Sequence, residues 1–298
     1  MENFLTKKFG KIFNLQFIAE GWWSKAYSFT AEGQQHIIRT GNHVQDFMKD
    51  HWAFIHLNNT KIPIPEVLEY GNYHDNEYYC ISRKANGDPS DEIMDHLDHY
   101  SQTELAKIII RQLENIHLSD TTNLSGWGFT DAHGKGMFPS WQHFLLSFYN
   151  SKTTASWQHL AQTSWLNRQL FTHLIEKMKS FFPYLPNEKY ILHGDFGFDN
   201  LLLDGNRKVT AVLDWAEMML GDPLYDLLHM NEPWIRDTGP DFLSIWLNMK
   251  PGYINFEHIE ERLQCYRIHY TLFHLYIHTV RKEHDDYQKI ENWAINNL

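Results

Sequence analysis

Residues 189–214 constrain the fold more than any other part of the chain, because short apolar runs are separated there by polar and turn-forming residues. Residues 189–193 predict one strand, and residues 201–203 and 209–213 predict two more. Asp204-Gly205-Asn206 lies between the last two and is typical of a hairpin turn. A hairpin turns the chain back on itself, so the residues that flank it are expected to lie near one another.

Three oxygen-bearing side chains accompany this hairpin. Asp195 stands five positions before Asn200, and Asp214 follows the second strand. Magnesium prefers oxygen ligands, so Asn200 and Asp214 are candidate metal ligands. Phosphoryl transfer also needs a separate carboxylate to accept the proton of the attacked hydroxyl, and Asp195 fits that role. With His193, these residues have the H-x-D-x-x-x-x-N spacing of the protein-kinase catalytic loop.

Asp195-Phe196-Gly197 also spells D-F-G, the string that marks the metal-binding aspartate of protein kinases. Here the string follows His193 by two residues and precedes Asn200, which is the catalytic-loop position. We therefore assign the metal-binding aspartate to Asp214 and the base to Asp195.

The rest of the chain predicts an α+β fold with a small β-rich lobe, residues 1–84, followed by a larger helical lobe, residues 85–298. The Asn86-Gly87 pair marks the break between them. Strands are expected at 27–30, 36–39 and 77–82, with helices at 44–57, 104–117, 141–149 and 166–181, a long loop at 126–136, and further helices from Pro223 onward.

Composition excludes several classes of protein. Of the 298 residues, 43% are hydrophobic, which is too many for a disordered chain, and the net charge of −11 argues against a nucleic-acid binder. Two cysteines in a chain of this length suggest a reducing compartment and not a disulfide-stabilised scaffold. We find no signal-peptide pattern and no apolar run of about 20 residues that could cross a bilayer. The sequence thus predicts a cytoplasmic protein without membrane attachment, and it indicates no protein partner.

Residues 191–202 and 212–223 resemble the aminoglycoside phosphotransferase family, and the chain is most similar to its hygromycin B phosphotransferase branch. Further matches run in order along the chain, at 62–68, 79–87 and Pro233-Trp234. The resemblance implies a protein-kinase-like bilobal fold, with ATP bound between the lobes and Mg²⁺ as cofactor. It also implies transfer of the γ-phosphoryl group to a hydroxyl of a small cationic molecule, such as an aminoglycoside.

By position in the family, Asp195 would be the general base, Asn200 and Asp214 the metal ligands, and His193 a brace for the loop. On the nucleotide side, Ser24 would cover a phosphate, and the hinge from Ser82 to Ala85 would meet adenine. Two features depart from the family. The expected phosphate loop, residues 20–27, has only one glycine, and Arg39 stands where most members have lysine, with Asp50 as its expected acidic partner.

For a cationic acceptor, carboxylates and aromatic rings near the core motif are the candidate ligands. They are Asp199, Glu217, Glu232 and Trp234. Asp222 is instead expected to cap a helix that starts at Pro223, and Asp226 is expected to be structural. His274 and His278 share one helix face, but the pattern of a zinc protease is missing, so ordinary helix residues are expected there.

Two other functions share parts of this pattern. A kinase of choline, homoserine, a methylthiosugar or a macrolide would use the same phosphate-transfer core. A nucleotide-binding pseudokinase would account for the glycine-poor loop and Arg39, but not for the presence of all three core polar residues. A protein kinase is disfavoured, because no Ala-Pro-Glu sequence closes an activation loop after Asp214.

Overall fold

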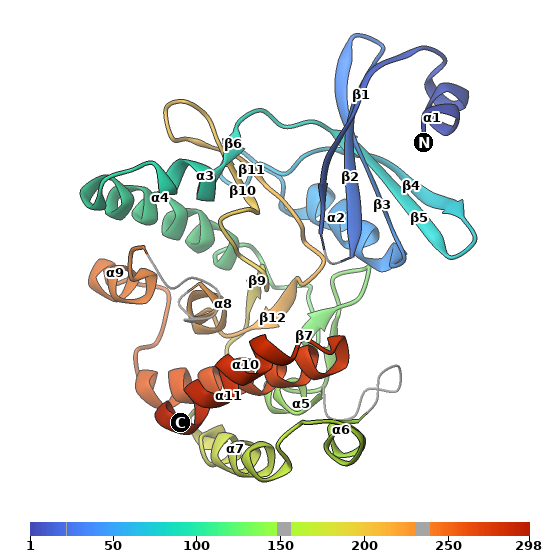
Figure 1. Cartoon of the computed structure of the whole chain (residues 1–298). Coiled ribbons are helices and arrows are strands. Elements are labelled where there is room, and N and C mark those ends of the chain that lie inside the picture. Colours follow the sequence, from blue (N-terminus) through green and yellow to red (C-terminus); the bar gives the residue numbers. More distant parts are fainter. Residues whose placement is uncertain (22, 148–155, 231–238) are drawn as a thin grey trace. The chain divides into compact units, whose positions relative to one another are not determined.

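The computed structural model describes residues 1–21, 23–147, 156–230 and 239–298. The chain forms two compact units (Figure 1). The first unit comprises Met1–Ser119, Thr130–Lys135 and Gly197–Met218. The second unit comprises Asp120–Phe129, Gly136–Phe196 and Met219–Leu298. The chain therefore passes from the second unit to the first between Phe196 and Gly197, inside the D-x-x-x-x-N motif.

An antiparallel sheet with the strand order β1-β2-β3-β5-β4 dominates the first unit. Alternate residues of β5 face opposite sides, so Ile81 packs with Leu5 of the N-terminal helix, whereas Cys80 packs with Phe47 of the following helix. The elements are α1 (Glu2–Phe9), β1 (Ile12–Glu20), β2 (Ser24–Ala31), β3 (Gln34–Gly41), α2 (Val44–Leu57), β4 (Val67–His74) and β5 (Glu77–Arg83). The predicted strands and the helix at 44–57 are confirmed, whereas α1, β1 and β4 were not predicted.

The predicted hairpin forms the rest of the sheet structure of this unit. Strands β10 (Leu201–Leu203) and β11 (Val209–Val212) pair antiparallel, and β6 (Asp88–Pro89) adds a third strand. The Asp204 carboxylate accepts the backbone N–H groups of Asn206 and Lys208, both at 2.9 Å, which closes the turn. Helices α3 (Ser90–Asp95) and α4 (His99–His117) follow β6.

A four-stranded sheet with the order β8-β7-β12-β9 begins the second unit. Its strands are β7 (Trp127–Thr130), β8 (Gly136–Phe138), β9 (Tyr190–Leu192) and β12 (Met219–Gly221). The prediction of a long loop at 126–136 is therefore wrong, because β7 lies within this range and β8 begins at its last residue. Glycine permits their approach: a Cβ on Gly126 would lie 2.0 Å from the carbonyl oxygen of Gly136.

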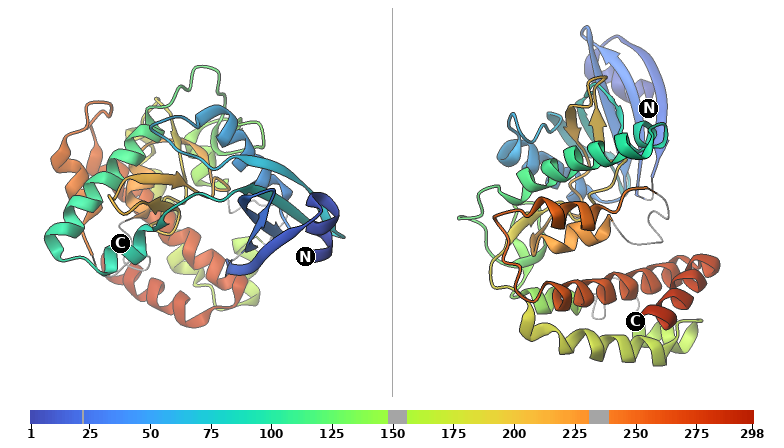
Figure 2. Two further views of the ribbon diagram at one scale, coloured as in Figure 1. Left: turned by 90° about the horizontal axis from the view of Figure 1, so that it is seen from above. Right: turned by 90° about the vertical axis from the view of Figure 1, so that its left-hand side faces the viewer.

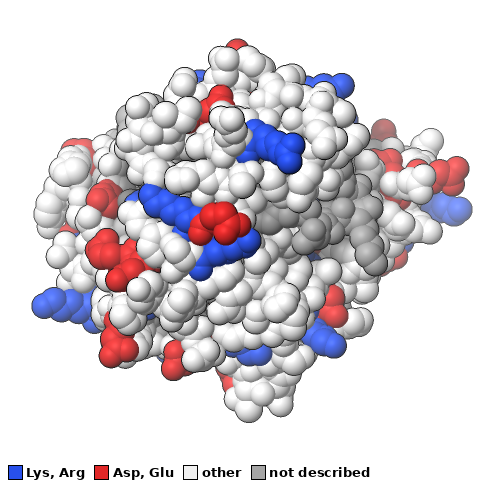
Figure 3. All heavy atoms as spheres, turned by 90° about the horizontal axis from the view of Figure 1, so that it is seen from below, with Lys and Arg blue, Asp and Glu red and all other residues white. Residues whose placement is uncertain are grey.

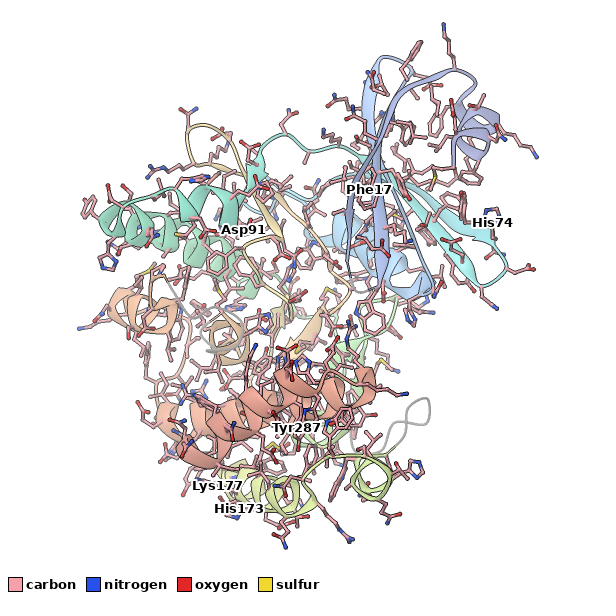
Figure 4. The ribbon with its side chains drawn as sticks, in the orientation of Figure 1. Phe17, His74, Asp91, His173, Lys177 and Tyr287 are labelled. Atoms are coloured by element: carbon pink, nitrogen blue, oxygen red, sulfur yellow. The ribbon has the colours of Figure 1, made fainter. Side chains whose placement is uncertain are left out.

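Helices make up the remainder of the second unit, and the long α10 lies beside α7, α8 and α11 (Figures 1 and 2). The Tyr287 hydroxyl accepts the backbone N–H of Asn167 at 2.8 Å and so ties α11 to the start of α7 (Figure 4). The helices are α5 (Trp141–Leu145), α6 (Trp157–Thr163), α7 (Arg168–Ser180), α8 (Leu224–His229), α9 (Phe242–Met249), α10 (Ile259–Arg281) and α11 (His284–Asn297). The helix predicted at 141–149 ends earlier, at Leu145, while the one predicted at 166–181 is confirmed.

Among the described residues, no helix is both long enough and apolar enough to span a membrane. Lysine and arginine side chains alternate with aspartate and glutamate side chains on the face shown in Figure 3. The described part of that face therefore shows no continuous basic stripe of the kind that tracks a nucleic-acid backbone.

Candidate active site

A buried ion pair links β3 and α2 in the first unit. The Arg39 guanidinium donates to one carboxylate oxygen of Asp50, and the two side chains are 21% and 7% exposed. Burial alone would lower the pKa of Arg39, but the neighbouring charges of Asp50 and Asp214 outweigh burial and raise it. Arg39 therefore stays cationic, and the ion pair with Asp50 that the sequence predicts is present.

The second carboxylate oxygen of Asp50 accepts the backbone N–H of Trp215 at 2.9 Å. A single buried carboxylate thus connects Arg39 with the residue after Asp214. Asp214 itself has a φ of 56°, which is uncommon for a residue other than glycine. Its carboxylate accepts the N–H of Ala216 at 3.3 Å. The loop after β11 is therefore held in a tight, specified conformation.

Lys49 places a second cation at this loop. Sequence reasoning did not predict this role for Lys49. Its side chain is buried on α2, and its Nζ donates to the carbonyl oxygen of Ala216 at 2.5 Å. Burial lowers the pKa of Lys49, although Glu217 and Asp50 oppose that shift. A lysine in a helix usually indicates a solvated face, so only its position beside Asp50 could have suggested this role. Glu217, a predicted acceptor ligand, thus lies within the electrostatic reach of Lys49.

The two predicted metal ligands stand at the same open end of the hairpin. The backbone N–H of Leu213 donates to the carbonyl oxygen of Asn200 at 2.8 Å, directly beyond the Leu201–Val212 pair. Asn200 and Asp214 are therefore brought together as their positions around the hairpin predict. Asp199 directly precedes Asn200 in the chain. Its carboxylate lies close to Gly197, because a Cβ added to Gly197 would be 2.6 Å from Oδ1 of Asp199.

The other predicted residues of the first unit have separate positions. Ser24 begins β2, and its carbonyl oxygen accepts the N–H of Gly21 at 2.9 Å. Ser82 lies within β5, paired with Ile37, and Ala85 follows the end of that strand. The predicted acceptor ligands Glu232 and Trp234 lie outside the described residues.

A buried carboxylate also supports the predicted base in the second unit. Asp226 of α8 accepts the backbone N–H groups of His193 and Gly194, both at 2.9 Å, just before Asp195. Asp226 and His193 are fully buried, which supports the predicted structural role of Asp226. The Asp195 side chain is 48% exposed, and its Oδ1 lies 3.1 Å from Nε2 of His229. The predicted base is accessible, as proton transfer requires.

Asp222 forms a deeply buried ion pair in the second unit. Arg262 donates to both of its carboxylate oxygens, at 2.7 and 2.8 Å, and the Tyr266 hydroxyl donates at 2.6 Å. The predicted helix start is off by one residue, because α8 begins at Leu224 with Pro223 in the N-cap position. Asp222 still accepts the N–H of Leu224 at 3.2 Å. The pair with Arg262 was not predicted, because the two residues are 40 positions apart.

The phosphotransferase enzyme family matches residues 14–253 of this chain. Hygromycin-B 4-O-kinase from Escherichia coli is 27% identical over 295 residues, which cover 96% of this chain and 81% of that protein. A thermostable mutant of aminoglycoside phosphotransferase APH(4)-Ia, solved in a ternary complex with AMP-PNP and hygromycin B, is 25% identical. The likeness has a TM-score of 0.82 and covers 99% of this chain and 97% of that one.

Aminoglycoside 2'-phosphotransferase-IIIa in its GDP complex is more distant in sequence, at 14% identity, with a TM-score of 0.69. That likeness covers 100% of this chain and 98% of the other, and at this identity it concerns the fold alone. Together, the solved structures confirm the predicted protein-kinase-like α+β fold.

Proposed function

The chain belongs to the phosphotransferase enzyme family, and we propose that it transfers the γ-phosphoryl group of ATP to a hydroxyl of hygromycin B. The proposal of hygromycin B as the acceptor rests on the 27% identity to hygromycin-B 4-O-kinase over 96% of this chain. ATP as donor is supported by the AMP-PNP in the similar solved structure. Such a reaction inactivates an antibiotic, so resistance is the proposed biological role.

The proposed base is Asp195. It takes the proton of the acceptor hydroxyl while that oxygen bonds to the γ-phosphorus, and the bond from the γ-phosphorus to the bridging oxygen breaks to release ADP. Two observations support the assignment: its side chain is half exposed, and Asp226 holds the backbone immediately before it. Removing the proton as the bond forms prevents positive charge from building up on the attacking oxygen.

Asn200 and Asp214 are the proposed ligands of Mg²⁺. They offer hard oxygen donors from the same end of one hairpin, and the left-handed backbone of Asp214 holds its loop in a defined conformation, so the residues fit the ion. The chemistry that bound Mg²⁺ supplies is neutralisation of charge on the phosphate oxygens. Arg39 would add a fixed cation for the phosphates, Ser24 would cover a phosphate, and the segment from Ser82 to Ala85 would meet adenine.

A small cationic acceptor is proposed to bind through carboxylates and a ring, namely Asp199, Glu217, Glu232 and Trp234. The net charge of −11 supports attraction of a polycation. We further propose that residues 1–84 bind the nucleotide and that residues 85–298 carry the catalytic loop, the metal ligands and the acceptor site. The cytoplasm is the proposed location, because ATP is available there and both cysteines are buried without a disulfide bond.

The test is an ADP-release assay with purified protein, ATP and a panel of acceptors. Hygromycin B and other aminoglycosides form one group; choline, homoserine, a methylthiosugar and a macrolide form the other. The proposal expects turnover with hygromycin B, formation of a phosphorylated product by mass spectrometry, and loss of turnover when EDTA removes Mg²⁺. Turnover with a member of the second group alone would identify a different kinase. Binding of Mg-ATP without turnover on any acceptor would identify a pseudokinase.

A further inference from the structure

His229 is the last residue of α8 and contacts the proposed base directly. Its Nε2 lies 3.1 Å from Oδ1 of Asp195, and the two side chains are 14% and 48% exposed. An ionised carboxylate can only accept hydrogen bonds, so Nε2 carries the hydrogen whenever Asp195 is charged. The imidazole therefore donates to one oxygen of Asp195, and that contact restricts the orientation of the carboxylate.

Titratable residues of α10 lie near His229. From α10, the ring of Tyr270 lies 5.4 Å from the imidazole, centroid to centroid, and His274 follows one turn later. Burial raises the pKa of Tyr270 and lowers that of His274 to about 3, so both are neutral near neutral pH. Helix α9 also packs against α8, but it contains no titratable residue. On α8 itself, Asp226 is engaged with the backbone before Asp195.

We infer that His229 is a positioning residue for Asp195, and that its protonation weakens Asp195 as a base. This inference rests on the proposed function, in which Asp195 takes the proton of the acceptor hydroxyl. With His229 neutral, its N–H donates to Oδ1 and so orients the carboxylate that accepts that proton. With His229 protonated, the imidazolium stabilises the charged carboxylate, so Asp195 binds the proton of the hydroxyl less strongly. Turnover should therefore fall as the pH decreases through the titration of His229.

Two variants separate positioning from titration. In His229→Gln, the side-chain amide nitrogen can replace Nε2 as a donor but does not titrate. In His229→Leu, the hydrogen bond is lost. We expect His229→Leu to lower kcat by roughly 10- to 100-fold with the KM for ATP unchanged. A loss of this size is expected when a catalytic group is misplaced. We expect His229→Gln to keep kcat within about threefold of the wild type at pH 8.

The deciding measurement is kcat with hygromycin B between pH 5.5 and 8.5, by ADP release. In the wild type, kcat should fall toward acidic pH. In His229→Gln, the midpoint of that fall should move at least about one pH unit lower, because the titrating imidazole is gone. A His229→Gln profile that overlays the wild-type profile would overturn the inference, as would a wild-type kcat in folded His229→Leu.

His269→Gln is the matched control. His269 is also buried in the second unit, but its Nδ1 contacts the Tyr225 hydroxyl at 2.8 Å, and burial lowers its pKa to about 3. The same substitution there should leave the pH profile in place, and an equal shift would overturn the inference. Thermal unfolding of each variant verifies folding, and if His229→Leu does not fold, the His229→Gln profile decides. A wild type without transfer to any acceptor would overturn the proposed function and the inference together, whereas an active wild type with an unchanged His229→Gln profile overturns the inference alone.

Discussion

Two buried arginine–aspartate pairs among the described residues differ in how much of the cation reaches the surface. Arg39 of the first unit is 21% exposed beside Asp50, whereas Arg262 of the second unit is 4% exposed beside Asp222. Arg262 also donates to the backbone carbonyl of Asn255 at 2.5 Å. A guanidinium closed in by protein on all sides stabilises the fold, and one that is partly open can also contact a ligand. The comparison therefore gives Arg262 a structural role and supports the proposal that Arg39 contacts a phosphate.

The largest change in stability is expected at the closed pair. Arg262→Ala leaves Asp222 as a buried charge without its bidentate partner, which costs about 3–5 kcal/mol in the free energy of unfolding. Urea unfolding measures this cost. Under conditions where the variant remains folded, the KM for ATP should match that of the wild type. A variant as stable as the wild type would remove Arg262 from the structural role assigned here.

Arg39→Ala should mainly weaken the binding of ATP. Loss of one charge-assisted contact to phosphate, worth about 1.5–3 kcal/mol, predicts a KM for ATP about 10- to 100-fold higher. Arg39→Lys is the matched control, and it should recover part of the loss because lysine keeps the charge but lacks the planar fork. Steady-state kinetics with varied ATP measure both variants. An unchanged KM in Arg39→Ala would place the phosphates away from Arg39.

At Lys49 we expect a smaller effect on the free energy of unfolding, and this effect depends on pH. Burial lowers its pKa from 10.5 in the folded protein, so the unfolded chain binds more protons between that lowered value and 10.5. The free energy of unfolding of the wild type should therefore rise with pH in this window, relative to that of Lys49→Met. Urea unfolding of both proteins at about pH 8 and pH 10 measures the difference, with the window set by the reference lysine value. A difference in unfolding free energy between the two proteins that is the same at both pH values would contradict the burial of the charged amine.

The smallest effect is expected at an exposed pair. Lys289 and Asp286 lie 3.2 Å apart on α11, with 73% and 52% of their side chains exposed. Solvent screens such a pair, so Lys289→Ala should change the free energy of unfolding by less than about 0.5 kcal/mol. The same urea experiment measures it and sets the baseline for the two buried pairs. A loss as large as that of Arg262→Ala would undermine the link between burial and stability used here.

Local patterns predicted the central strands and the hairpin. The helix at 44–57 and the turn at Asp204 follow from apolar spacing and turn chemistry, and both are present. Strand β1 was missed because its large apolar residues are not alternately buried: Phe13 and Phe17 are 50% and 56% exposed. Figure 4 labels Phe17 on this strand. Two register shifts against β2 further disturb its period of two residues.

The candidate site was predictable where neighbours in sequence are neighbours in space. Asn200 and Asp214 follow from the hairpin between them, whereas Asp50 follows from the resemblance, which expects the acidic partner of Arg39 on the next helix. The hydrogen bond from Trp215 to Asp50 and the contact of His229 with Asp195 span 165 and 34 positions, respectively. Contacts at such separations depend on tertiary packing, which neither spacing nor composition encodes in a single sequence.

Asp195→Ala tests the account most directly. General-base catalysis contributes about 10²- to 10⁴-fold to rate, so kcat with ATP and hygromycin B should fall by that factor. The dissociation constant for Mg-ATP should remain unchanged, because Asn200, Asp214 and Arg39 are intact. Stopped-assay ADP release and isothermal titration measure the two quantities on the same preparation. A variant that keeps the wild-type kcat would contradict the assignment of Asp195 as the base, and with it the proposed site.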